Sequence, residues 1–245
     1  MEKMIYKRIA PYYDTLMKGV NYQGWIEYIK NICILNNIEP KTILDLGCGT
    51  GQAAFLLLKE GYEVIGIDGS FEMLKVAKQK LSLFNPSLIQ SKFDLFFIKK
   101  KVDMVISLFD SLNNLLVENE LFNTFTCVKN ILKDKGIFVF DMNTIYGLSL
   151  LDNTSVRIFD NVYSIWQSQY DKYNQITTLH ITLFISDKNE CYKRIDETHK
   201  EKGYSLFCIK SLLKKAGFKR TSFYEHPTFR RATSRTKRVM VVART

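Results

Sequence analysis

The stretch Ile43–Gly51 reads Ile-Leu-Asp-Leu-Gly-Cys-Gly-Thr-Gly and decides the fold, because an apolar run leads into three alternating glycines. A helical segment follows, and then a second apolar run that ends in the carboxylate of Asp68. A strand, a glycine turn, a helix and a second strand with a terminal acid make up a βαβ unit. The stretch therefore predicts a chain that binds a nucleoside-bearing cofactor.

Each part of this unit has a physical role. Gly47, Gly49 and Gly51 tolerate positive φ angles and carry no Cβ, so the backbone can come close to a ligand. The helix expected at Gln52–Glu60 begins with backbone N–H groups that have no intrahelical partner. Asp68 ends its strand, where we expect it to accept hydrogen bonds from both hydroxyls of a ribose.

The spacing of the glycines and the acid before them indicate which cofactor binds. The dinucleotide fingerprint G-x-G-x-x-G requires a third glycine where this chain has Gln52, and Gly51 comes one residue too early. Asp45 places a carboxylate beside the loop, which would repel a pyrophosphate but suits a cofactor with an amino group and a sulfonium. A nicotinamide oxidoreductase is therefore the least favoured class.

The pattern from Asp45 to Gly51, followed by the strand-terminal Asp68, resembles the class I S-adenosylmethionine (SAM)-dependent methyltransferases. Further segments resemble that family in order along the chain: Ala10–Asp14, Asp68–Leu74, Ser91–Asp94, Val102–Asp110 and Leu132–Asp141. The first is similar to the opening of small bacterial members, including sugar-amine and glycine-type N-methyltransferases. In the last, Asp134 and Lys135 replace the usual Pro and Gly.

The resemblance implies a set of residues around SAM, whose product would be S-adenosylhomocysteine, and it implies no metal. Tyr13 would close over the cofactor's carboxylate, and Asp94 or its neighbourhood would recognise the adenine. Cys48 lies inside the glycine loop, where packing is more in keeping with its position than chemistry. The expected cofactor-binding residues are Tyr13, Asp45, Gly47, Cys48, Gly49, Gly51, Asp68, Gly69, Met73, Phe93, Asp94 and Leu108.

Apolar strands alternate with helical patterns from residue 42 to residue 143, which predicts an α/β fold with a parallel sheet. Two strands near the C-terminus, Phe218–Glu225 and Val239–Ala243, complete a doubly wound sheet of seven strands whose last strand is antiparallel. We expect residues 1–150 and 203–245 to form the SAM-binding domain. Residues 151–202 are expected to form an antiparallel β lid inserted after the fifth strand.

Two-residue periodicity in Asn161–His199 supports that lid. Leu179, Ile181, Leu183 and Ile185 fall on one face of a strand, and Asp187–Asn189 is a turn signal. About three antiparallel strands are expected. Because the insertion leaves from the carboxyl end of a parallel strand, it should lie over the cofactor.

Composition limits the class of protein. The 245 residues contain no run long enough to span a bilayer and no signal peptide, so we expect a cytoplasmic enzyme without membrane contact. The five cysteines show no C-x-x-C pair, which argues against a zinc site or a disulfide framework. The net charge is +10, and Lys214–Thr245 holds ten Lys and Arg but only one acid, Glu225.

The favoured function is methyl transfer from SAM to the nitrogen or oxygen of a small, anionic, soluble acceptor. Asp110, His180 and His199 are the candidates for handling a proton, and His226 is a weaker one. Trp166 and Tyr192, together with Tyr170, would wall the acceptor pocket, although aromatics at such positions also form sheet cores. Arg230 and Arg231 in the loop His226–Arg238 would bind the acceptor, unless that loop is only a solvated face.

Two alternatives remain open from the sequence. The basic C-terminus would suit a tRNA or other nucleic-acid methyltransferase, although Leu108–Asn113 lacks the Asn/Asp-Pro-Pro-aromatic motif of the amino-methylating enzymes and no catalytic Pro-Cys pair occurs. The chain could also bind SAM without transferring its methyl group. The identity of the acceptor and the oligomeric state are not given by the sequence.

Overall fold

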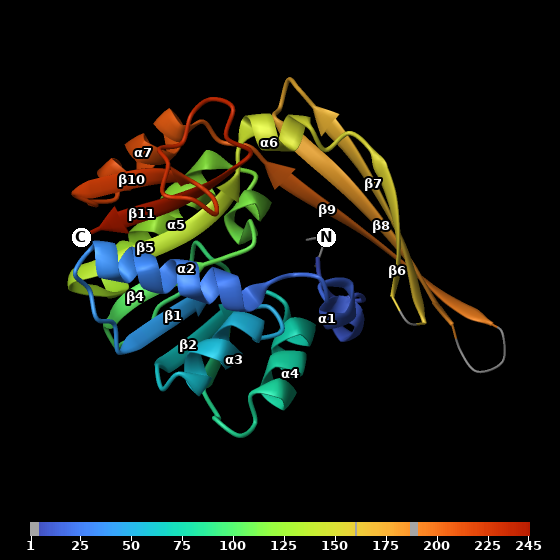
Figure 1. The fold of residues 1–245 in the computed structure, drawn as a ribbon, viewed down its shortest axis with the longest axis horizontal. Coiled ribbons are helices and arrows are strands. Elements are labelled where there is room, and N and C mark those ends of the chain that lie inside the picture. The colour runs from blue at the N-terminus through green and yellow to red at the C-terminus, as the bar shows by residue number, and fades with distance from the viewer. Residues whose placement is uncertain (1–4, 160, 187–190) are drawn as a thin grey trace.

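Two sheets organise the chain in the computed structural model, which describes residues 5–159, 161–186 and 191–245. A seven-stranded sheet carries helices on both faces, and a four-stranded sheet projects from one end of the molecule (Figure 1). Within the described part, none of the helices is both long and apolar enough to cross a membrane.

The seven-stranded sheet has the strand order β10-β11-β5-β4-β1-β2-β3. The pairings among β1, β2, β3, β4 and β5 are all parallel, whereas β11 runs antiparallel to both β5 and β10. The predicted doubly wound sheet with an antiparallel last strand is therefore confirmed. Its strands are β1 (Thr42–Leu46), β2 (Glu63–Asp68), β3 (Ser87–Gln90), β4 (Val102–Ser107), β5 (Leu132–Asn143), β10 (Arg220–Glu225) and β11 (Arg238–Arg244).

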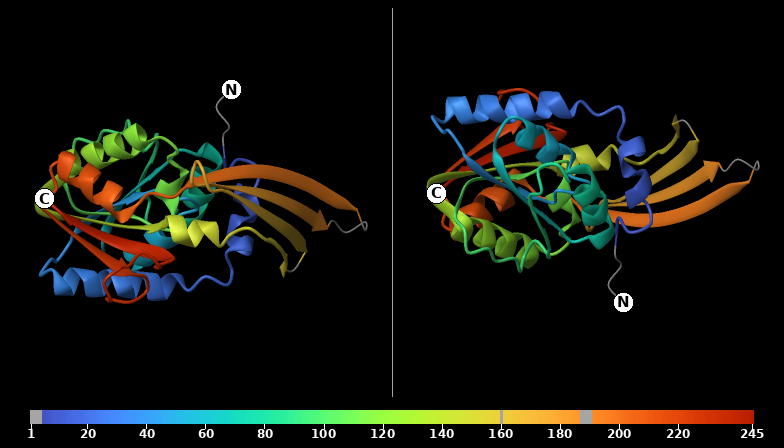
Figure 2. Two further views of the ribbon diagram at one scale, coloured as in Figure 1. Left: turned by 90° about the horizontal axis from the view of Figure 1, so that it is seen from above. Right: turned by 90° about the horizontal axis from the view of Figure 1, so that it is seen from below.

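Helices cover both faces because successive side chains of a strand point to opposite sides of the sheet. Leu44 and Phe138 pack toward α5 and α7, whereas Ile43 and Met104 pack toward α2, α3 and α4. Figure 2 shows α2 on the face opposite to α5 and α7. These helices are α2 (Tyr22–Leu35), α3 (Gln52–Lys59), α4 (Phe71–Lys80), α5 (Glu118–Ile131) and α7 (Leu206–Lys215).

The parallel strands bring the polar motifs to a single edge. All five residues of β1 are buried, as expected for a strand covered on both faces. The carboxyl ends of β1, β2 and β4 lie side by side, because β1 pairs with both of the other strands. The glycine loop Gly47–Gly51, Asp68 and Asp110 therefore meet at this edge, where such sheets bind ligands.

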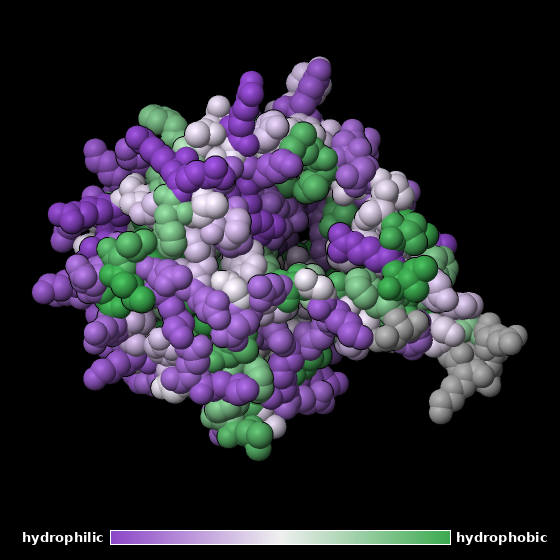
Figure 3. Space-filling model, in the orientation of Figure 1, coloured by the Kyte–Doolittle hydropathy of each residue, from purple (hydrophilic) through white to green (hydrophobic). Residues whose placement is uncertain are grey.

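The projecting sheet is built from β6 (Thr154–Phe159), β7 (Val162–Asp171), β8 (Ile176–Ser186) and β9 (Tyr192–Lys202), each antiparallel to its neighbours. Ile181, Leu183 and Ile185 are buried on one face, as the periodicity predicts. They pack against Ile9 and Leu16 of the N-terminal segment, which we define as residues 5–16. This segment contains the short helices η1 (Ala10–Tyr12) and α1 (Tyr13–Leu16). A hollow opens between the main body and this sheet (Figure 3).

The structure differs from the sequence expectation in two places, and a third expectation is not tested. The inserted sheet has four strands rather than about three, because the exposed edge strand β6 precedes the Asn161–His199 stretch from which the strands were predicted. A short helix, α6 (Ile145–Ser149), follows β5, where Gly147 approaches so closely that a Cβ would lie 2.0 Å from the carbonyl oxygen of Lys237. The expected turn Asp187–Asn189 lies outside the described residues.

Candidate cofactor and acceptor site

A cavity of about 730 Å³ lies at the carboxyl ends of the parallel strands. It is lined by every predicted cofactor-binding residue except Gly51, and by residues of the N-terminal segment. Among the described residues, none from the four-stranded sheet lines it. We had expected the sheet to lie directly over the cavity, and it does not. It packs on the N-terminal segment, which lines the cavity.

The glycine loop is shaped by close packing as well as by backbone angles. Gly47 has a φ of +83°, and a Cβ there would lie 2.8 Å from Ser111 Oγ and 3.1 Å from Phe93 Cζ. Gly51 also has positive φ, but its Cβ would lie 3.2 Å from Ala77 of α4 and 2.9 Å from Leu81, which follows that helix. The first glycine thus leaves room at the cavity, whereas the third allows α3 to pack against α4.

Asp68 is fixed to the glycine loop by two backbone hydrogen bonds. Its Oδ2 accepts from the Gly49 N–H and its Oδ1 from the Ser70 N–H, each at 2.8 Å. Burial raises the pKa of this carboxyl, while the backbone hydrogen bonds from Ser70 and Gly49 lower it. Since a carboxylate oxygen has two lone pairs, one on each oxygen remains for a ligand such as a ribose hydroxyl.

Asp45 is a buried carboxyl with an incomplete set of partners. Only 2% of the residue is exposed, and its Oδ2 has no hydrogen-bond partner among the described residues. Burial, and next the charge of Asp68, raise the pKa of Asp45 to about 7. Because an unpartnered buried carboxyl is costly, the geometry suits a ligand that brings a cationic amino group to this wall.

Aromatic rings from the N-terminal segment enclose another wall of the cavity. Tyr6 and Tyr13 both line it, and their rings make an edge-to-face contact at 5.9 Å. Burial raises the pKa of both hydroxyls well above the ordinary value. Tyr22 and Phe109 also line the cavity, with ring centroids 4.8 Å apart.

Glu197 of β9 holds the N-terminal segment in place. Its carboxylate accepts hydrogen bonds from the backbone N–H groups of Tyr6, Arg8 and Ile9, and it pairs with His199 Nε2 at 2.9 Å. Burial opposes its charge, but the hydrogen bonds from His199 and the backbone lower the pKa of Glu197. His199 is 3% exposed and lies against the Tyr6 ring, so the structure gives it an anchoring position and does not place it in the cavity wall.

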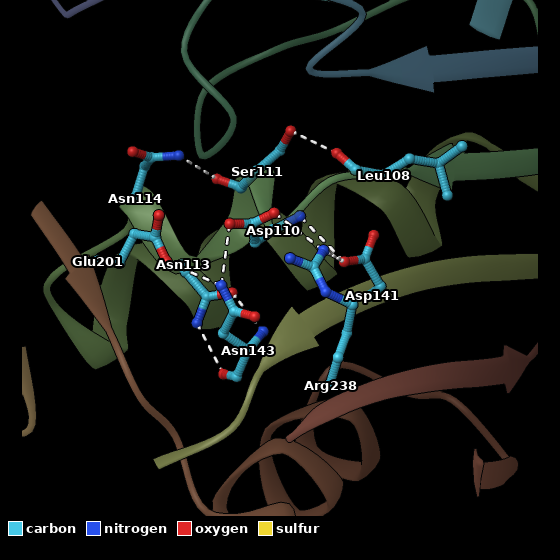
Figure 4. A network of polar contacts seen from close by, with 9 residues as sticks. All are labelled: Leu108, Asp110, Ser111, Asn113, Asn114, Asp141, Asn143, Glu201 and Arg238. Atoms are coloured by element: carbon cyan, nitrogen blue, oxygen red, sulfur yellow. Dashed lines mark hydrogen bonds and ion pairs between the residues drawn. The ribbon is translucent and has the colours of Figure 1, made fainter. Parts of the chain in front are cut away.

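Asp110 belongs to a polar network behind the loop that follows β4 (Figure 4). Its Oδ2 accepts from Asn143 Nδ2 at 2.9 Å, and the same amide group donates to Glu201 Oε2 at 2.9 Å. Arg238 Nη1 donates to Asp110 Oδ1 at 2.9 Å and also to the buried Asp141. Asp110 itself adopts a left-handed backbone conformation, with φ of +53°, as does Phe109 before it. Such strain outside glycine is typical of functional loops.

Other side chains that we predicted for the acceptor site lie away from the cavity. His180 is exposed and contacts Thr198, while Trp166 donates to Ser164 Oγ at 3.0 Å. Tyr192 is 53% exposed and contacts Tyr163. None of these three lines the cavity that the described residues form.

The basic loop also turns away from the cavity. Arg230 has 77% of its side chain exposed and pairs with Glu225, and Arg231 is exposed. His226 stacks on Trp25 of α2 with ring centroids 4.0 Å apart, and burial lowers its pKa to about 4. The loop is thus packed on α2, and only Arg238 at its end reaches the polar network.

Comparison with known proteins identifies the class of enzyme that this fold and site define. Residues 43–136 match the family model described as "Methyltransferase domain". The chain is 34% identical over 219 residues to the putative methyltransferase YqeM of Bacillus subtilis, covering 88% of this chain and 87% of the relative. The chain therefore belongs to the class I SAM-dependent methyltransferase family.

Solved structures agree with this assignment. A SAM-dependent methyltransferase from Clostridium acetobutylicum superposes with a TM-score of 0.86 and 29% identity over 97% of both chains. The sugar N-methyltransferase KedS8 from a Streptoalloteichus species gives a TM-score of 0.82 over 100% of this chain and 96% of its own, but at 16% identity it shows the fold alone.

Several residues at the site were not found from the sequence. Glu201 and Asn143 lie in segments that we read only as strands, and Arg238 was one of many cations in the C-terminal stretch. Asp141 ends a segment that resembles the family's fifth strand, which is the one local signal that was available. The other cavity-lining residues that we did not assign include Tyr22, Ser111 and Asn114.

Proposed function

We propose that the protein transfers the methyl group of SAM to a nitrogen or oxygen atom of a small acceptor bound between the cavity and the four-stranded sheet. The observation that carries the proposal is the unpartnered Asp45 Oδ2 beside a glycine loop tied to Asp68. SAM carries an amino group that would pair with Asp45 and a ribose that would bind Asp68.

Different residues of the cavity would bind different parts of the cofactor. Asp45 would receive the amino group, Asp68 the ribose hydroxyls, and Phe93 and Asp94 the adenine. When bound, SAM supplies an activated methyl group, so the protein's main task is to position the acceptor and exclude water. Tyr6 and Tyr13 are placed to exclude water, since both are buried rings of the cavity wall.

The basic loop does not require the acceptor to be anionic. An anionic acceptor was expected because of Arg230 and Arg231, yet both side chains are exposed and neither lines the cavity. The acceptor therefore needs no negative charge on account of this loop. Its small size is supported by the enclosure of the cavity by Tyr6, Tyr13 and Tyr22.

The proposal is tested by titrating SAM into the purified protein in a calorimeter and by measuring S-adenosylhomocysteine formation with candidate acceptors. Asp68→Ala removes a charged acceptor of two ribose hydrogen bonds, so SAM affinity should fall by about 100-fold or more. Asp152→Ala, an exposed carboxylate between α6 and β6, is the matched control and should not change it. Equal affinity in the wild type and Asp68→Ala would contradict the placement of SAM.

Nucleic-acid methylation is a second candidate because Arg230, Arg231 and Arg235 form an exposed basic loop. A single-stranded or transfer RNA that bound there would lose affinity steeply as salt increases. Filter binding with the wild type and with the triple variant Arg230→Ala, Arg231→Ala, Arg235→Ala would separate the two functions. Equal and weak binding by both proteins leaves the small acceptor as the substrate, and retained SAM without turnover of any acceptor would indicate a SAM-binding protein.

A further inference from the structure

The polar network behind the cavity contains more acid than base. Asp110, Asp141 and Glu201 gather around a single cation, Arg238, among the residues that the structure describes (Figure 4). Arg238 compensates Asp141 and one oxygen of Asp110. Glu201 receives one hydrogen bond from a neutral amide, that of Asn143. The network therefore holds three carboxyl groups and one cation, and the Arg238 hydrogen bonds go to the other two carboxyls and not to Glu201.

Glu201 and Asp110, which we call the carboxyl pair, approach each other across Asn143. The Asn143 amide donates to both of them at 2.9 Å, and Asn113 fixes the backbone of Asn143 and of β9 from the other side. Burial, and next the charge of Asp110, raise the pKa of Glu201 well above its usual range. Two carboxyl groups in such proximity favour sharing a proton or a cation.

The carboxyl pair lies next to the cavity, although neither Asp110 nor Glu201 is among the residues that line it. Phe109 and Ser111, the neighbours of Asp110 in the chain, both line the cavity, and Asp110 keeps 20% of its side chain exposed. The charges of Glu201 and Asp110 act on the hydroxyl of Tyr6, which is itself in the cavity wall. The aromatic rings around this end, those of Tyr6, Tyr13 and Tyr22, are surfaces that attract a cation.

Resting on the proposed function, we propose that Glu201, paired with Asp110, binds the acceptor as a primary or secondary ammonium ion and removes its proton before methyl transfer. A cation at this position supplies the charge that the network lacks. An acceptor alcohol could donate a hydrogen bond but brings no positive charge, and an acceptor carboxylate would repel the carboxyl pair. The inference thus names a cationic amine as the substrate class and assigns a proton acceptor from the inserted sheet.

The proposed step is balanced as follows. The ammonium gives one proton to the Glu201 carboxylate, and the nitrogen lone pair so released forms the new N–C bond. The bond between the methyl carbon and sulfur breaks, and its electron pair stays on sulfur. The product leaves as a methylated ammonium, and Glu201 returns its proton to water. Since Glu201 must be ionised to act, methyl transfer should increase as the pH rises through the pKa of Glu201.

Four groups from other elements bear on that titration. Asp110 after β4 raises the pKa of Glu201, and Arg238 on β11 lowers it. Asp141 on β5 faces the same guanidinium, and Tyr6 of the N-terminal segment lies within range of the Glu201 charge. The pH profile therefore reports the network and should shift when Asp110 is replaced by Asn.

The test uses protein that contains ¹³C-labelled glutamate and is saturated with S-adenosylhomocysteine, and the Glu201 Cδ signal is assigned by its loss in Glu201→Gln. The probes are aromatic and aliphatic primary amines, each with its matched alcohol and carboxylate, for example 2-phenylethylamine, 2-phenylethanol and 3-phenylpropionate. We expect the amines to bind, to lower the pKa of Glu201, and to bind about 10- to 100-fold more weakly to Glu201→Gln.

The control is Glu63→Gln, which removes an exposed carboxylate at the amino end of β2 and should leave amine binding unchanged. The inference is overturned if Glu201 titrates like an ordinary glutamate and no amine moves its signal, or if the alcohols or carboxylates bind as well as the amines. Failure of the proposed function looks different, because the wild type would then bind neither SAM nor S-adenosylhomocysteine in the calorimeter.

Discussion

The cofactor half of this site and the half that we propose for the acceptor, called the acceptor half below, are built in opposite ways. The cofactor half is continuous in sequence: the glycine loop Gly47–Gly51 and Asp68 lie within one βαβ unit and are joined by a Gly49–Asp68 hydrogen bond. The acceptor half joins Asp110 in the loop after β4 to three residues on separate strands, Asn143 on β5, Glu201 on β9 and Arg238 on β11. The difference teaches that a local motif can place the methyl donor, whereas the acceptor depends on how distant segments meet.

The largest stability effect is expected where the acceptor half depends on one cation. Arg238→Met leaves the buried Asp141 and Asp110 without their counter-ion and should lower the free energy of unfolding by about 3 kcal/mol. Arg230→Met, which breaks an exposed pair with Glu225, should cost less than about 1 kcal/mol. Urea denaturation of both variants measures the difference, and equal losses would show that the network does not hold the acceptor half together.

The next largest effect concerns the cofactor half. Gly47→Ala adds a Cβ at positive φ and within 2.8 Å of Ser111 Oγ, so it should lower the free energy of unfolding by about 2 kcal/mol and abolish SAM binding. Gly49→Ala has a similar φ but open space around its Cβ, and it should cost about 1 kcal/mol. Thermal unfolding and SAM titration of the two variants separate backbone strain from crowding. A smaller loss for Gly47→Ala than for Gly49→Ala would refute the close approach at Ser111.

A third prediction concerns Glu197, which ties the N-terminal segment to the four-stranded sheet and so links the two halves. Glu197→Gln should cost about 1–2 kcal/mol at pH 7, because three backbone N–H groups lose a charged acceptor. The pKa of Glu197 is lowered in the folded protein. The stability that its charge contributes is therefore present above the unfolded pKa of about 4.3 and is lost as the pH falls through the folded pKa. The free energies of unfolding of the wild type and of Glu197→Gln should become equal in acid.

The matched control for this prediction is Asp196→Asn on the same strand. Asp196 is exposed and its hydrogen bonds come from neighbours of its own sheet, Arg194 and Thr182, while Arg8 of the N-terminal segment acts on it only through its charge, so its loss should change the free energy of unfolding by less than about 1 kcal/mol. Urea denaturation at several pH values compares the two. If Asp196→Asn is as destabilising as Glu197→Gln, the N-terminal segment is not held by Glu197.

The last prediction has the opposite sign, because this substitution should stabilise the folded protein. The pKa of Asp45 is raised to about 7 in the folded protein, so between about pH 4 and pH 7 the folded chain keeps a proton that the unfolded chain has released. The wild type without SAM therefore loses stability as the pH rises through this window. Asp45→Asn should escape that loss and be more stable than the wild type at pH 8, with no difference at pH 4. Denaturation curves without SAM measure it, and a less stable variant at pH 8 would show that Asp45 already has a partner.

The sequence was sufficient for the features that depend on local order. The alternation of apolar strands and helices predicted the seven-stranded sheet, and the register of Ile181, Leu183 and Ile185 predicted the buried face of β8. Asp45, Asp68 and Gly47 were placed at the cavity because parallel strands must end at one edge. The edge strand β6 was missed, because it lies before the periodic stretch Asn161–His199 and its side chains stay largely exposed where it pairs with β7.

The acceptor half was harder to predict for a physical reason. Arg238 carries the same charge as Arg230, and only the pairing of β11 with β5 turns it toward Asp141. His199 seemed suited to proton transfer by residue type, yet the N-terminal segment covers it and gives it Glu197 as a partner. Such outcomes depend on contacts between segments far apart in the chain, which periodicity and spacing do not encode.

The division of the site into two halves is tested most directly by calorimetric titration of SAM into the wild type, Asp45→Asn and Glu201→Gln. Asp45→Asn removes the charge that faces the cofactor's amino group and should weaken SAM binding by about tenfold or more. Glu201→Gln should leave SAM affinity within about twofold of the wild type. The account is contradicted if Glu201→Gln weakens SAM binding as much as Asp45→Asn, or if Asp45→Asn binds SAM as tightly as the wild type.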